Sequence, residues 1–75
     1  MLTLKQVAVA IDDTTRRPRG WLLLGAPHQG QGRDARFDKE CLVSWCEAGA
    51  EDARAAGDPE NAGRWQGYVD RLRAA

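Results

Sequence analysis

Apolar positions with helical spacing open the chain. They stand at i, i+3, i+4 and i+7, positions that share one face of a helix; the residues are Leu4, Val7, Ala8 and Ile11. Gln6 stands three residues after Thr3, which is the spacing of a capping box. The turn-forming pair Asp12–Asp13 follows the last apolar position. The pattern therefore predicts a first helix that begins after Thr3 and ends near Ile11.

The segment Thr14–Pro27 combines arginines with apolar residues and is open to two interpretations. As a helix, it would be capped by Thr14 or Thr15 and would end at Gly25. Pro18 would then lie in the first turn, where a proline is tolerated. As a strand, only Trp21–Leu24 would be extended, after an Arg-Pro-Arg-Gly turn. We favour the helix, because residues that can start and stop it flank the segment.

Polar residues and glycines replace the apolar positions over "HQGQGRD", residues 28–34. A segment with two glycines and no large apolar residue is typical of a loop tip. The preceding "GAP" and the following "ARFD", which alternates as a short strand does, complete a small predicted β-hairpin. Arg33 would lie at its tip and Arg36 on its return strand.

Two further helices are predicted after the hairpin. Asp38 is positioned to cap the first, which extends to about Gly57. Asp58 is positioned to cap the second, and Pro59 suits its first turn. Apolar residues repeat with helical period along both helices and are expected in the core with Trp21; they are Leu42, Trp45, Cys46, Trp65, Tyr68, Val69 and Leu72. The free cysteines Cys41 and Cys46 are interpreted as small core residues.

The predicted fold is mostly α-helical with a small β-hairpin wing. The chain of 75 residues allows one domain with a compact core. We expect a winged helix-turn-helix over residues 1–57. An extra amphipathic helix over residues 58–75 is expected to pack on the same domain.

Charge is distributed unevenly, although the net charge is zero. Residues 1–39, the cationic half, carry seven lysines and arginines against four acids, a net charge of 7 − 4 = +3. Residues 40–75, the acidic half, carry four arginines against seven acids, a net charge of 4 − 7 = −3. This asymmetry is expected of a protein that binds a polyanion with one side.

Several function classes find little support in the sequence. No apolar run approaches the roughly 18 residues that a membrane span needs, and the first residues do not form a secretory signal, so we expect a cytoplasmic protein. One histidine and two cysteines, spaced five apart, predict neither a metal site nor a disulfide. No Gly-Lys-Ser/Thr follows "GQG", and no nucleophile stands with a base, so we expect neither an enzyme nor a cofactor.

Two segments resemble a known family. "TLKQVAVAIDDTTRRPRGWLLLGAP" is similar to the start of excisionase and MerR-type winged helix-turn-helix domains. "RFDKECLVSWCEAG" resembles the element after their wing, with Phe37, Asp38 and Trp45 in the matching places. The small terminase subunits of lambda-like phages share the pattern. The resemblance covers about residues 3–48.

The resemblance implies double-stranded DNA as the partner. The second helix would enter the major groove, and the wing would contact flanking phosphates or the minor groove. The candidate DNA-binding residues are Arg16, Arg17 and Arg19 on the second helix, Arg33 and Arg36 in the hairpin, and Lys5 on the first helix. The hairpin residues Gln29 and Gln31 could hydrogen-bond in a groove. The plainer interpretation of each residue is a solvated surface side chain.

An excisionase-like role is the function that the resemblance favours. Such a protein would bind DNA near an attachment site, beside a recombinase or neighbouring copies of itself, and would bend or coat the DNA. One alternative is a small-terminase-like module for DNA packaging. Another is a protein-interaction module, such as a phage-encoded inhibitor. Zero net charge and the leucines of Leu22–Leu24 favour this last alternative, because an exposed apolar patch indicates a protein partner.

Overall fold

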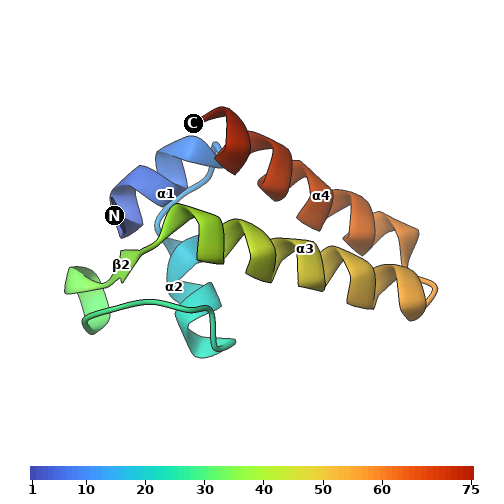
Figure 1. Ribbon diagram of the computed structural model, residues 1–75, viewed down its shortest axis with the longest axis horizontal. Helices are drawn as coiled ribbons and strands as arrows, with labels where there is room; N and C mark the ends of the chain where they lie inside the picture. The colour runs from blue at the N-terminus through green and yellow to red at the C-terminus, as the bar shows by residue number, and fades with distance from the viewer.

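The computed structural model describes all 75 residues, Met1–Ala75, as four α-helices and a small sheet (Figure 1). The helices are α1 (Leu4–Ala10), α2 (Arg16–Leu23), α3 (Lys39–Ala55) and α4 (Pro59–Ala74), the strands are β1 (Leu2–Thr3) and β2 (Arg36–Phe37), and a 3₁₀ turn spans Gly32–Asp34. The expected combination of mostly helix with a little β-structure is confirmed. None of the helices has the length and apolar character needed to cross a membrane.

Helix α1 begins with the predicted capping box. The Thr3 hydroxyl accepts from the backbone N–H of Gln6 at 3.0 Å, and the Gln6 side chain accepts from the backbone N–H of Thr3 at 2.9 Å. The four residues of the predicted apolar stripe are all buried. The helix ends where Asp12 takes a positive φ of 56°. The local signals in this segment were therefore sufficient to place the helix.

The segment after α1 is the helix α2, so the alternative strand at residues 21–24 is wrong. Pro18 lies in the first turn and is buried with Trp21. Thr15 stands at the N-cap position, but its side chain makes no capping hydrogen bond. The helix ends before Gly25, whose φ of 93° is a left-handed conformation that favours glycine.

The segment predicted as a hairpin, residues 25–38, is here called the wing, and it differs from that prediction. Its two sides meet only at Gln29 and Arg36, which exchange backbone hydrogen bonds of 2.7 and 2.8 Å, and the tip is the 3₁₀ turn. The strand β2 instead forms its sheet with β1, where Leu2 pairs with Phe37. The reason is compositional, because the polar, glycine-rich segment before the tip has no β-branched or aromatic residue to favour a longer strand.

Helices α3 and α4 lie side by side and antiparallel, and together they form the long axis of the molecule (Figure 1). Asp38 caps α3 by accepting from the backbone N–H of Cys41, and Asp58 caps α4 by accepting from that of Asn61. The prediction of two core cysteines is half wrong. Cys46 is buried, and burial raises the pKa of its thiol to about 12. Cys41 is exposed because it lies in the first turn of α3, outside the stripe of buried residues that runs from Leu42 through Cys46 to Ala50 and Ala53.

An aromatic cluster joins α2 to the α3–α4 pair. Trp21 is buried at its centre, with ring centroids 5.8 Å from Trp45, 5.8 Å from Trp65 and 5.2 Å from Tyr68. Trp45 and Trp65 are partly buried against the same core. Gly49 makes this possible, since a Cβ there would lie 3.0 Å from the Trp65 ring. The position of α2 therefore depends on side chains from three helices.

Candidate nucleic-acid interface

Helix α2 is the centre of the candidate interface. Its buried side carries Pro18 and Trp21, which fix it to the core. Its exposed side carries Arg16, Arg19 and Leu23, which share one face because they stand at i, i+3 and i+7. We call these three residues the α2 ridge. A hollow lies on each side of the ridge, one toward the wing and one toward α4.

The hollow toward the wing, here the wing-side groove, gathers cationic side chains. One part of it has a volume of about 240 Å³ and is lined by four of the six predicted site residues, from four separate elements: Lys5, Arg19, Arg33 and Arg36. The remaining lining residues are Thr3, Leu4 and Thr15. No carboxylate lines this part of the groove. The fold thus concentrates positive charge from residues up to 31 positions apart in the sequence.

The wing-side groove continues along α2. Its second part has a volume of about 600 Å³ and shares Arg19 and Arg33 with the first. Leu23, His28 and Gln31 also line it. The Nδ1 atom of His28 lies 2.8 Å from the Ala26 carbonyl oxygen. Gln31 therefore lines the wing-side groove, whereas Gln29 lines neither part of it.

The second hollow, here the α4-side groove, has a volume of about 640 Å³. Arg16 and Arg17 of α2 and Arg64 of α4 line it, together with the carboxylate of Asp13 and the aromatic rings of Trp65 and Tyr68. Arg64 was not predicted as a site residue. Nothing in the local sequence indicates it, because its proximity to α2 depends on the packing of α4 against the aromatic cluster.

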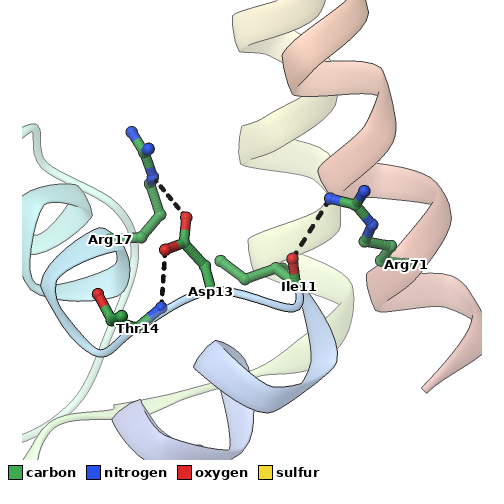
Figure 2. A network of polar contacts seen from close by, with 5 residues as sticks. All are labelled: Ile11, Asp13, Thr14, Arg17 and Arg71. Carbon is green, nitrogen blue, oxygen red and sulfur yellow. Dashed lines mark hydrogen bonds and ion pairs between the residues drawn. The ribbon is translucent and has the colours of Figure 1, made fainter.

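Arg17 differs from the other predicted residues because it is already paired within the cationic half (Figure 2). Its Nε donates to Oδ2 of Asp13 at 3.0 Å, and its guanidinium carbon lies 5.9 Å from the centre of the Tyr68 ring. The backbone N–H of Thr14 also donates to Asp13, at 2.7 Å. The hydrogen bonds from Thr14 and Arg17 hold the pKa of Asp13 below its usual value, and Asp13 raises the pKa of Arg17.

Five cationic side chains have no hydrogen-bond or ion-pair partner in the molecule. They are Lys5, Arg16, Arg19, Arg33 and Arg64, and all five line the two grooves beside α2. Arg36 is intermediate, since it donates to the carbonyl oxygens of Asp34 and Ala35 and to no carboxylate. The cationic side chains that lack any partner are therefore concentrated around one short helix.

The other three arginines of α3 and α4 each have a hydrogen-bond or ion-pair partner within the molecule. Arg73 pairs with Glu47 at 2.9 Å, and Arg54 donates to Gln66 at 3.1 Å. Arg71 donates to the carbonyl oxygen of Ile11 at 3.3 Å, at the end of α1 (Figure 2). Of these three arginines, only Arg73 is paired with a carboxylate, whereas Arg54 and Arg71 donate to neutral acceptors.

Comparisons with protein-family models, curated proteins and solved structures gave no match for this chain. Within the molecule, no group of three or more His, Cys, Asp and Glu side chains is placed to hold a metal ion. What the grooves offer chemically is a set of unpaired guanidinium and ammonium donors. Such donors bind phosphate oxygens, and a guanidinium can also bind the N7 and O6 atoms of guanine.

Proposed function

We propose that this protein binds double-stranded DNA through the α2 ridge and the two grooves beside it. The observation that carries the proposal is the convergence of all five unpaired cations on these grooves. An α-helix with its side chains is about 10–12 Å in diameter, so α2 can enter a major groove about 12 Å wide. The two phosphate strands that border a major groove would lie against the arginines on either side.

The residues divide into two roles in this proposal. Lys5, Arg33 and Arg36 in the wing-side groove, with Arg64 in the α4-side groove, would contact phosphates and supply most of the affinity. Arg16 and Arg19, on the ridge itself, are placed to contact base edges. Arg17 would contribute less, because Asp13 neutralises it locally.

The biological role that we propose is that of an excisionase-like architectural factor. This part rests on the resemblance of residues 3–48 and on the small size of the module. One domain of 75 residues offers a limited interface, so strong binding would need neighbouring copies on DNA or a recombinase partner. An architectural factor bends its site, so a duplex labelled at both ends is expected to show increased energy transfer on binding. A packaging module would bind without that change.

A salt titration tests the DNA-binding proposal. We expect fluorescence anisotropy with a labelled 30-base-pair duplex to show affinity that falls steeply with salt, with a slope of log K against log salt of about −3.6 for four phosphate contacts. The double variant Arg33→Ala, Arg64→Ala is expected to reduce that slope by about 1.8, because two of the four phosphate contacts are lost.

The matched control removes the same charge from the other side of the molecule. The double variant Arg54→Ala, Arg73→Ala also loses two positive charges, but both are engaged with α3–α4 partners. We expect it to bind DNA as the unmodified protein does. Equal losses in the two double variants would mean that net charge, and not the grooves, governs binding.

A second candidate function is protein interaction. It is favoured by Leu23, which is 91% exposed, and Leu24, which is 68% exposed, at adjacent positions near the end of α2. For this function we expect no DNA binding even at low salt, together with concentration-dependent association in sedimentation measurements.

A further inference from the structure

Leu23 is the most exposed of the large apolar side chains, at 91%. Single exposed apolar residues are common on protein surfaces, so exposure alone assigns no role. The position of Leu23 is more informative. It lies one turn after Arg19 and two turns after Arg16 on the α2 ridge, and it lines both the wing-side and the α4-side groove.

Leu23 is thus an apolar side chain on the α2 ridge, between the wing-side groove and the α4-side groove, and cationic side chains line both grooves. In the proposed DNA complex, the α2 ridge is the part of the helix that lies deepest in the major groove. The one apolar group that the major groove offers is the C5-methyl of thymine. A leucine in this place has no hydrogen-bonding capacity, so it can contribute to sequence recognition only through such a contact.

We infer that Leu23 contacts thymine methyl groups and makes the protein prefer thymine next to the bases that the ridge arginines contact. The inference rests on the proposed DNA-binding function. Charge complementarity favours DNA over a protein at this face, because a partner that covered Leu23 would also have to cover the unpaired Arg16 and Arg19.

The test compares thymine with uracil, which lacks only the methyl group. A duplex is first selected by the protein from a random-sequence 30-base-pair library, and is then synthesised with thymine or with uracil at every position. We expect the uracil duplex to bind about fourfold more weakly for each methyl contacted, from the burial of one methyl-sized group. Leu23→Ala is expected to bind both duplexes equally, with an unchanged melting temperature because the side chain is exposed.

Leu24→Ala is the matched control. Leu24 is the next residue and is also exposed, but it lies about 100° around the helix and lines only the α4-side groove. It is expected to keep the preference for thymine. Equal binding of both duplexes by the unmodified protein, or the same preference in Leu23→Ala, would overturn the inference while leaving DNA binding intact. Failure to bind any duplex would overturn the proposed function with it.

Discussion

The α3–α4 pair and the α1–α2–wing region use their cationic side chains in different ways. In the α3–α4 pair, most arginines are held by the molecule itself, as in the ion pair of Arg73 with Glu47. Around α2, Arg16, Arg19 and Arg33 have no such partner. The difference teaches that the net charge of zero is a poor guide to this surface, because what a polyanion meets is the charge that remains unpaired.

The contrast has a structural origin. In the acidic half, the two long helices lie side by side, and Arg73 on α4 reaches Glu47 on the facing helix α3. The cationic half carries only four acids, of which Asp13 pairs with Arg17 and Asp38 caps α3. The cations of the wing-side groove are therefore free because no carboxylate lines that groove.

The largest expected effect comes from breaking the junction between the two regions. Trp21→Ala removes the central ring of the aromatic cluster, which is 2% exposed. We expect the free energy of unfolding to fall by about 3–5 kcal/mol, measured by urea denaturation. The whole domain is expected to lose its helical signal in one transition. A loss confined to a small part of the signal would mean that the two regions fold separately.

A smaller effect is expected from straining the wing alone. Gly30 has a φ of 78°, and a Cβ there would lie 2.7 Å from the Asp34 carbonyl oxygen. Gly30→Ala is expected to destabilise the protein by roughly 2–4 kcal/mol, or to shift the turn that carries Arg33 and weaken DNA binding. Urea denaturation and anisotropy measure the two outcomes.

Gly32→Ala is the control for the wing. Gly32 also has a positive φ, of 55°, but a Cβ there would meet nothing within 4 Å. Only the conformational cost of roughly 1–2 kcal/mol is then expected. Equal effects of the two substitutions would show that the close approach to Asp34 does not matter.

The smallest expected effect comes from turning Arg17 into an unpaired cation. Because the pKa of Asp13 is lowered in the folded state, its carboxylate stabilises the fold above the ordinary value of 3.8, and this contribution is lost as the pH falls below it. Asp13→Asn lacks that contribution. Its melting temperature is therefore expected to fall less between pH 5 and pH 2.5 than that of the unmodified protein.

The same variant sharpens the comparison of the two regions. With Asp13 neutral, Arg17 becomes available to phosphate, and the salt slope is expected to steepen by about 0.9. Asp12→Asn removes the same charge one residue earlier without removing a partner of Arg17, and is expected to leave the slope nearly unchanged. An equal change in both variants would assign the effect to general charge.

Sequence reasoning succeeded where the signals were local. The caps at Thr3, Asp38 and Asp58 each fixed the start of a helix, because a capping side chain and its target lie within three residues. The pairing of Asp13 with Arg17 was also visible as an i, i+4 spacing, although the prediction treated Arg17 as free.

Features that depend on tertiary packing were not predictable in the same way. The strand β2 pairs with β1, whose residues lie 33 or more positions earlier in the sequence. No pattern in residues 1–3 indicates that they form a strand. Arg64 reaches the α4-side groove only because α4 folds back along α3. The exposure of Cys41 likewise follows from which face of α3 meets α4.

The hydrogen bond from Arg71 to the carbonyl oxygen of Ile11 has a consequence for biosynthesis. A helix end near the start of the chain obtains its cap from a residue made 60 positions later. On the ribosome, α1 and α2 emerge long before Arg71, Tyr68 and Leu72 can reach them. The packing of the first two helices is therefore complete only after α4 has been synthesised, because α4 supplies both Tyr68 beside Trp21 and the arginine that bonds to the end of α1.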